Sequence, residues 1–227
     1  SATWMKDSVL LSLQLATSTT SPLCRTLGDP SHCNFQKRLS LLLRGECPVA
    51  STIQYLYTRI SKWLDAPVQL DDVIACTKRL RWIGNRTRQW RCVVAILRFQ
   101  CRSVCTATRF QLRDSSCRFG CQVGQDCQKH FARCPALCAC TSYIAGLLRI
   151  APPLVADGSL DLPRVLLLAP QLSVDYDIFC SVLVDAILHA HNLARTSDFV
   201  HTPDTLNSAV TATFKACLLY TSPSPRD

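Results

Sequence analysis

The sequence predicts a mainly α-helical protein, an irregular assembly of several helices with a small Cys/His-rich loop and helix in its middle. Two observations lead to this fold class. Apolar residues recur every three or four positions in most segments, whereas the alternation that marks a half-buried strand is rare. Hydrophobic residues make up 48% of the 227 residues, which is enough for a core and too many for a disordered chain. We find no internal repeat and divide the chain into five segments.

Residues 1–70 are predicted to form an N-terminal helical segment. Weak helical patterns over residues 3–15 and 34–43 come before a stronger one that Pro48 opens and Ala66–Pro67 ends. Its intervals of three and four indicate a side that faces the core. The core-facing positions are Ile53, Leu56, Ile60 and Leu64. Because the chain starts at Ser1 without an initiator Met, we expect it to be a piece of a longer protein.

Residues 71–116 are predicted to form a basic helical segment. Asp71 and Asp72 suit the first turn of a helix, where the macrodipole favours acidic side chains. Paired aspartates also occur at the metal site of reverse transcriptases, but that motif has an aromatic residue two positions earlier, where this chain has Gln69. We therefore interpret the pair as a helix start. Gly84–Asn85 is expected to divide the segment into two helices.

The basic residues of this region predict a nucleic-acid surface. Residues 78–118 contain eleven Lys or Arg residues and one acid, Asp114. Forked guanidinium groups suit phosphate, and the net charge of +9 agrees with RNA or DNA as the partner. A solvated face that serves only solubility is the alternative. Four arginines are expected on one stripe of the second helix, namely Arg88, Arg91, Arg98 and Arg102. The residues expected to contact nucleic acid are Arg86, Arg88, Arg91, Arg98, Arg102, Arg109, Arg118 and Lys129.

Residues 117–140 contain a C-x3-C-x8-H-x3-C pattern, formed by Cys117-Arg-Phe-Gly-Cys121 and His130-Phe-Ala-Arg-Cys134. Three thiolates and one imidazole are ligands that zinc prefers, in a tetrahedral array. Gly120 lets the backbone turn, so that two thiolates can face one point. His130 and Cys134 are four residues apart and would lie on the same side of a short helix. The spacing predicts a zinc-knuckle-like site with Cys117, Cys121, His130 and Cys134 as ligands.

The sequence around the motif leaves alternatives open. Asp126 is a suitable N-cap for the short helix, and Pro135 discourages its continuation past Cys134. The same segment could instead hold disulfides, or buried thiols that pack as small apolar residues. Because the 15 cysteines are an odd number spread along the chain, we expect a reducing compartment with most thiols free. Nearby cysteines that could compete for the metal are Cys127, Cys138 and Cys140.

Residues 141–216 are predicted to form a C-terminal helical segment, which a helical pattern over residues 137–150 leads into. Ser173 is a good N-cap for a helix that runs to about residue 194, with two acids in its first turn. His189 and His191 cannot share a face of that helix, so we expect a partly buried and a surface histidine rather than a joint metal site. A last helix is expected over residues 203–216.

Two further features concern the chain's end and its hydropathy. Residues 217–227, Cys-Leu-Leu-Tyr-Thr-Ser-Pro-Ser-Pro-Arg-Asp, resemble the translation of a sequencing-library adapter, and we expect the natural sequence to end near Ala216. The cleanest uncharged apolar run lies between Arg133 and Arg149 and falls short of the ~20 residues that a membrane span requires. We therefore expect no membrane partner.

The run from Thr106 to Pro135 resembles the region that follows the polymerase domain in LINE-like, non-LTR retrotransposons. The resemblance rests on Thr106-Ala-Thr-Arg-Phe-Gln111, on the Cys117–Cys121 pair and on the His-x-x-x-Cys-Pro ending. It implies that the four predicted ligands bind zinc and that the surrounding Lys and Arg residues contact template RNA or target DNA. Cys127 departs from the pattern. Because we find no polymerase aspartates and no endonuclease constellation in this chain, we expect it to bind and position without catalysing.

Two functions from different classes follow from these observations. The first is a non-catalytic, zinc-stabilised, nucleic-acid-binding accessory region of a retroelement polyprotein. The second is a helical protein-interaction module whose cysteines fill the core and whose arginines keep it soluble. For both we expect an intracellular location, with the nucleus as a candidate compartment for the first.

Overall fold

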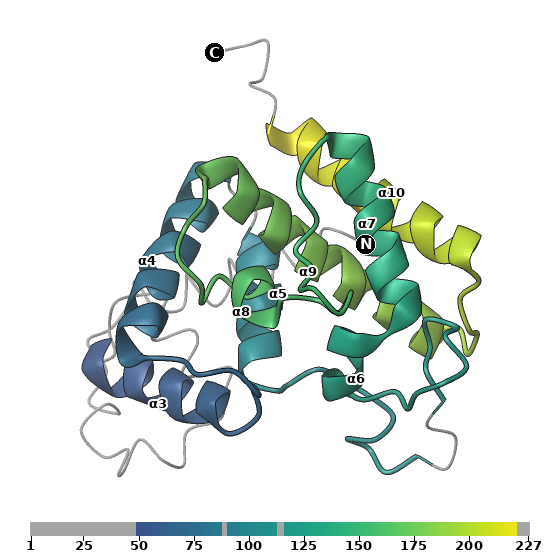
Figure 1. The fold of residues 1–227 in the computed structure, drawn as a ribbon, viewed down its shortest axis with the longest axis horizontal. Coiled ribbons are helices and arrows are strands. Elements are labelled where there is room, and N and C mark those ends of the chain that lie inside the picture. The colour runs from purple at the N-terminus through teal and green to yellow at the C-terminus, as the bar shows by residue number, and fades with distance from the viewer. Residues whose placement is uncertain (1–48, 88–89, 113–115, 222–227) are drawn as a thin grey trace, which may run out of the picture. The chain divides into compact units, whose positions relative to one another are not determined.

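The computed structural model describes residues 49–87, 90–112 and 116–221, which form eight helices and no sheet (Figure 1). The predicted mainly helical fold is therefore confirmed for these residues. Residues from Ile53 onward belong to one compact unit, and the weak helical patterns predicted over residues 3–15 and 34–43 lie outside the described residues. Outside the helices, the only described strand-like pairings are isolated bridges, Ser116 with Gln125 and Leu154 with Leu160.

Helix α3 spans Val49–Ser61 and buries the predicted apolar positions Ile53, Leu56 and Ile60. It ends earlier than the Ala66–Pro67 boundary that we predicted. The chain leaves the helix through a turn in which the Trp63 and Leu64 amides both donate to the Ile60 carbonyl, at 3.1 and 3.0 Å. Leu64 is nevertheless buried, so its apolar character reflects packing of this turn rather than a further turn of helix.

Helix α4 spans Leu70–Thr87, and Asp71 and Asp72 lie in its first turn as predicted. The Asp72 carboxylate also accepts a hydrogen bond from the Gln69 amide at 2.8 Å. The predicted break at Gly84–Asn85 is wrong, because α4 continues through both residues. A Cβ at Gly84 would lie 2.7 Å from the Trp90 ring, so this glycine permits close helix packing rather than ending a helix.

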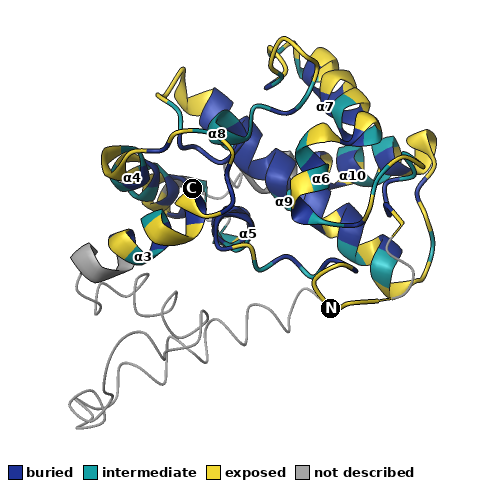
Figure 2. Cartoon of the chain, turned by 60° about the horizontal axis from the view of Figure 1, so that its bottom comes forward, coloured by how far each residue is buried: buried dark blue, intermediate teal, exposed yellow. Residues whose placement is uncertain are grey.

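Helix α9, Val174–Thr196, is the central helix of the unit and packs against α5 (Trp90–Gln100), α8 (Leu162–Val165) and α10 (Pro203–Thr221). Its predicted N-cap is confirmed, because the Ser173 hydroxyl accepts from the Tyr176 amide at 3.1 Å. Figure 2 shows most of α9 as buried. By length and composition alone α9 could cross a membrane, but 72% of its apolar stretch is buried inside the protein, as expected of a core helix. His189 is exposed and His191 is buried, so one histidine lies on the surface as expected, whereas the other is fully rather than partly buried.

The remaining helices are α6 (Gln128–Arg133), which carries one side of the Cys/His-rich segment, and α7 (Pro135–Leu148), which follows it directly. Helix α7 packs against α10. Helix α10 begins at Pro203, as predicted, but runs past Ala216 to Thr221, and the Cys217 side chain is buried. The adapter origin of residues 217–227 stays a prediction.

Candidate metal centre

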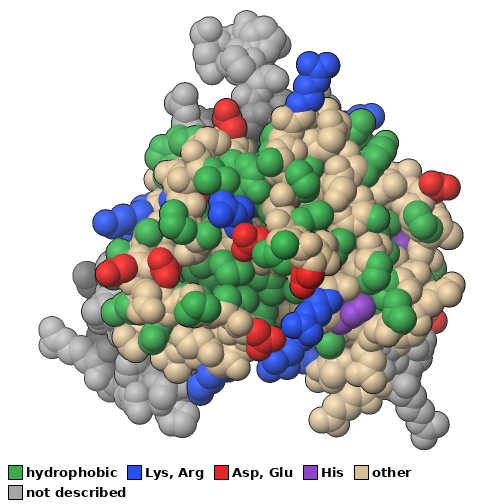
Figure 3. Space-filling view, in the orientation of Figure 1, with side chains coloured by type: hydrophobic (Ala, Val, Ile, Leu, Met, Phe, Trp, Pro, Cys, Tyr) green, Lys and Arg blue, Asp and Glu red, His purple; other side chains and the backbone are tan. Residues whose placement is uncertain are grey.

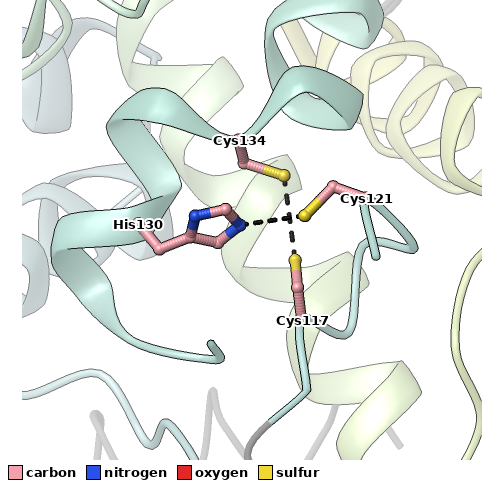
Figure 4. A group of neighbouring side chains, drawn as sticks. All are labelled: Cys117, Cys121, His130 and Cys134. Carbon is pink, nitrogen blue, oxygen red and sulfur yellow. Dashed lines mark hydrogen bonds between the residues drawn. The ribbon is translucent and has the colours of Figure 1, made fainter. Parts of the chain in front are cut away.

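The side chains of Cys117, Cys121, His130 and Cys134 point toward one another in the middle of the chain (Figure 4). Their three sulfur atoms and one imidazole nitrogen all lie within 4.8 Å of one another. The Cys117 and Cys134 sulfurs are 3.7 Å apart, and the Cys121 sulfur is 3.1 Å from His130 Nε2. The structure therefore brings together all four predicted ligands in a group that could hold a metal ion.

The separations can be compared with those in a tetrahedral zinc site. Zinc–sulfur bonds of about 2.3 Å place two sulfurs about 3.8 Å apart, and a zinc–nitrogen bond of about 2.0 Å places sulfur and nitrogen about 3.5 Å apart. The observed sulfur–sulfur distance of 3.7 Å matches this value, and the sulfur–nitrogen distance of 3.1 Å is a few tenths shorter. The group therefore has the dimensions of a zinc site.

The first pair of ligands lies on a tight turn that needs glycine. Gly120 has a φ of 81°, in the left-handed region, and its amide donates to the Cys117 carbonyl at 3.2 Å. A Cβ at this position would also lie 2.0 Å from the His201 carbonyl oxygen. The prediction that Gly120 turns the backbone between two thiolates is confirmed, and the structure adds the close approach of residue 201.

The second pair of ligands lies where α6 meets α7. His130 is in α6, which ends at Arg133, whereas Cys134 has extended geometry between the two helices, with φ −71° and ψ 113°. Pro135 is the first residue of α7, where its missing amide hydrogen costs nothing. The expected stop after Cys134 is thus confirmed, although the cysteine lies at a helix junction rather than on the same helix as His130.

Asp126 does not cap the short helix, so that prediction is wrong. The N-cap of α6 is Cys127, without a side-chain hydrogen bond. The buried Asp126 carboxylate instead accepts from the Ala107 amide at 2.7 Å and pairs with His191 Nε2 at 2.8 Å. A buried carboxylate must satisfy both oxygens, and these two distant partners do so. The pair ties the ligand-bearing loop to α9.

Gly124 lies against the His130 ring, and its role was not predicted from the sequence. A Cβ on this residue would lie 2.1 Å from the ring carbon Cε1 and 2.5 Å from the ligand atom Nε2. The Gly124 carbonyl also accepts from the Cys117 amide at 3.0 Å. One glycine therefore contacts ligands from both halves of the site. It could not be predicted from the sequence, because no known motif places a glycine at this spacing from Cys117 or His130.

The site is partly screened from water and already favours a thiolate. Cys117 and Cys134 are buried, whereas Cys121 and His130 are half-buried. Hydrogen bonds from the Cys134 thiol and from the backbone amides of Phe119 and Cys121 lower the pKa of Cys117 to about 5. The same pairing with Cys117, together with burial, raises the pKa of Cys134. A cation between the two sulfurs would favour the thiolate form of both.

The competing cysteines stay outside the group. The Cys138 thiol lies 3.7 Å from the Ala132 carbonyl, to which it donates, and burial raises the pKa of Cys140 to about 12. Cys127 is half-buried and is not among the four converging residues. None of the twelve described cysteines forms a disulfide, so the disulfide alternative does not hold for them.

A second group of possible ligands, which we did not predict, joins three helices. Cys92 from α5, Asp185 from α9 and Cys217 from α10 bring their ligand atoms within 4.8 Å of one another. A cation already occupies the neighbourhood, because Arg91 Nε lies 2.8 Å from the Asp185 carboxylate and its guanidinium donates to the Cys217 sulfur at 3.4 Å. Cys217 also opens the segment that we expect to be adapter-derived. We assign no metal to this group.

The predicted arginine stripe on one helix is not formed. Helix α5 spans Trp90–Gln100 and ends before Arg102, and Arg91 faces Asp185 of α9. The side chains of Arg86 and Arg88 lie outside the described residues. Packing of α5 against α9 explains the difference, because it turns part of the predicted basic face toward the half-buried Asp185 carboxylate.

The other predicted basic residues divide into two kinds. Arg118 is buried and pairs with Asp198 at 3.1 Å, and the exposed Lys129 lies 3.5 Å from Asp65. Arg98, Arg102 and Arg109 form no ion pair with any carboxylate in the described part of the chain and lie in the last turn of α5 or in the segment that follows it. Figure 3 shows Lys and Arg side chains beside a histidine on the face where Figure 1 places α6.

Comparisons with protein-family models, curated proteins and solved structures gave no match to this chain. The resemblance to LINE-like elements therefore rests on the Cys/His motif and its neighbours, and function has to be argued from the residues of the site.

Proposed function

We propose that the chain binds one structural zinc ion through Cys117, Cys121, His130 and Cys134 and acts as a nucleic-acid-binding accessory region. The observation that carries the proposal is the convergence of three sulfurs and one imidazole nitrogen within 4.8 Å. Soft thiolate ligands with a neutral imidazole select zinc over magnesium or calcium, which prefer oxygen. Four protein ligands complete a tetrahedral shell, and such closed sites are structural because no position remains for a substrate.

The clustering of these thiols distinguishes the site from ordinary core cysteines. Cys76, Cys101 and Cys180 are each buried singly in the unit, as expected of small apolar side chains. If the ligand cysteines were only core filler, nothing would require three of them to face one imidazole. This difference favours the zinc proposal over the alternative of an interaction module without metal.

The nucleic-acid part of the proposal is supported by the position of the basic residues. Lys129 and Arg133 are exposed on α6, the helix that carries His130. The segment that carries Arg109 is tied to the ligand-bearing loop, because the Asp126 backbone carbonyl accepts a hydrogen bond from the Thr108 amide at 3.2 Å. A zinc ion that fixes this loop would also fix the positions of the Lys and Arg residues around it. Their positive charge suits phosphates, as does the net charge of +9.

By the resemblance of its Cys/His motif, the parent protein would be a LINE-like retroelement polyprotein, in which this region positions RNA or DNA without catalysing. A closed metal site agrees with a positioning role. A retroelement also works inside the cell, where thiols stay reduced and can bind zinc.

The test is zinc content and nucleic-acid binding of the purified chain. Native mass spectrometry should give one zinc per chain. Cys121→Ser should lose it, whereas Cys138→Ser, a matched change of another half-buried thiol, should keep it. Affinity for RNA should fall steeply as salt rises, because bound phosphates release counterions. The proposal would be contradicted if the zinc-free protein were as stable as the zinc-loaded protein, or if the affinity for RNA did not change with salt.

A further inference from the structure

Four arginines gather around the end of α5, and one of them comes from a distant helix. Arg59 of α3 donates to the Cys101 carbonyl at 3.3 Å. Arg109 donates to the carbonyls of Arg102 and Val104, at 3.3 and 3.5 Å. The Arg98 guanidinium lies 3.9 Å from the Cys105 sulfur. We call Arg59, Arg98, Arg102 and Arg109 the arginine cluster.

The arginine cluster carries positive charge that the described part of the protein does not neutralise. None of its members forms an ion pair with a carboxylate in residues 49–87, 90–112 or 116–221. The Arg59 and Arg109 guanidinium groups instead bind backbone carbonyls at and just after the C-terminus of α5, which orients these two groups and leaves their other N–H groups available. Arg59, Arg102 and Arg109 are exposed. An anionic ligand can therefore reach a group of cations that is already held in place.

An exposed aromatic residue directly follows one member of the cluster in the sequence. Phe110 follows Arg109 and is 52% exposed, at the end of a turn in which its amide donates to the Thr106 and Ala107 carbonyls. A second aromatic ring contacts the cluster, because the Arg59 guanidinium lies 5.9 Å from the centre of the Tyr55 ring, within the range of a cation–π contact. Phosphate-binding cations with an open aromatic face next to them are the elements of a single-strand binding surface.

We infer that the arginine cluster and Phe110 bind single-stranded nucleic acid, with the arginines on consecutive phosphates and the Phe110 ring stacked on an unpaired base. The inference rests on the proposed function and names the form of nucleic acid that it takes. A duplex keeps its base faces stacked inside, so it can use the cations but not the ring. None of the contacts recognises a 2′-hydroxyl, so RNA and DNA single strands should both bind.

Two arginines whose backbone lies in the left-handed region provide a matched pair of positions for substitution. Arg102 has a φ of 53°, and the amides of Arg102 and Ser103 donate to the carbonyls of Phe99 and Arg98 in a Schellman cap. Arg149 has a φ of 55° in the same cap after α7. Glycine suits such positions better than arginine does, so Arg102→Gly and Arg149→Gly should both fold at least as stably as the original chain. Only Arg102 belongs to the arginine cluster.

The experiment measures fluorescence anisotropy of the zinc-loaded chain with a 20-nucleotide RNA strand, the DNA strand of the same sequence and the DNA duplex. Both single strands should bind about tenfold more tightly than the duplex. Arg102→Gly should weaken single-strand binding about threefold or more and reduce the salt slope of the logarithm of affinity by about 0.7, the loss of one phosphate contact. Phe110→Ala should weaken it about tenfold and leave duplex binding unchanged. Arg149→Gly should change neither.

The outcomes separate this inference from the proposed function. If the original chain binds neither single strands nor the duplex, the nucleic-acid function itself is wrong. If it binds but prefers the duplex, or if Arg102→Gly and Phe110→Ala bind single strands as well as Arg149→Gly does, the proposed function stands and the surface assigned here is wrong. Melting temperatures of the three variants exclude unfolding as the cause of any loss.

Discussion

Replacing Gly124 with alanine tests whether the His130 ring belongs to a metal site. The new Cβ would lie 2.1 Å from the ring carbon Cε1, whereas carbon atoms in contact are about 3.5–4.0 Å apart. The ring would have to move by more than about 1 Å. Zinc–ligand distances in a real site hold to within about 0.2 Å, so Nε2 would leave the site and zinc would keep three protein ligands.

The expected loss follows from that displacement. Disturbing a residue that only orients a ligand costs about 10–100-fold in metal affinity, so displacing the ligand itself should cost at least about 100-fold, or about 3 kcal/mol. If metal binding stabilises the fold to the same extent, the melting temperature of the zinc-loaded chain should fall by about 6–12 °C. Zinc affinity is measured by competition with a chromophoric chelator, and stability by thermal unfolding with and without EDTA.

Gly146→Ala is the matched control, because nothing lies within 4 Å of a Cβ at that position in α7. It should leave zinc affinity unchanged and stabilise the helix by up to about 1 kcal/mol. With EDTA present, most of the difference between Gly124→Ala and the original chain should disappear. If Gly124→Ala binds zinc as tightly as the original chain, His130 is not held as a ligand and the geometric argument is refuted.

Three further predictions concern packing and burial within the unit. Asp126→Ala should cost about 2–6 kcal/mol in urea unfolding, since it leaves the buried His191 Nε2 and the Ala107 amide without their partner, at about 1–3 kcal/mol each; a cost below about 1 kcal/mol would show that the pair does not tie the loop to α9. Gly84→Ala should cost about 1–3 kcal/mol, because its Cβ would lie 2.7 Å from the Trp90 ring, and an unchanged urea midpoint would contradict that contact. Burial raises the pKa of Cys101 to about 12, above its unfolded value of 9.0, so the stability it contributes is present below pH 9 and is lost as pH rises toward 12. Unfolding of the EDTA-treated chain between pH 8 and 11 should show this fall, and Cys101→Ala should reduce it; equal slopes in both proteins would exclude Cys101 as a cause.

Local patterns in the sequence gave reliable predictions where the interaction itself is local. Ser173 caps α9 because a hydroxyl and the amide three residues later are neighbours in any helix start. The four metal ligands could be named because they lie within 18 consecutive residues and zinc constrains their spacing. The core-facing side of α3 followed from its periodicity for the same reason.

Interactions between distant segments could not be predicted in this way. Asp126 looked like a helix cap, but its partners are at positions 107 and 191, and no local rule connects them. Gly84 looked like a helix break, although its role is to let the Trp90 ring approach. The prediction of an arginine stripe required α5 to expose one whole side. Arg91 instead faces Asp185 of α9, a contact that depends on tertiary packing.

X-ray absorption at the zinc edge of the purified chain measures the proposed metal site most directly. The predicted result is one zinc per chain with three sulfur neighbours at about 2.3 Å and one nitrogen at about 2.0–2.1 Å. A chain that takes up no stoichiometric zinc, or zinc bound only by oxygen and nitrogen, would contradict the assignment of Cys117, Cys121, His130 and Cys134 as its ligands.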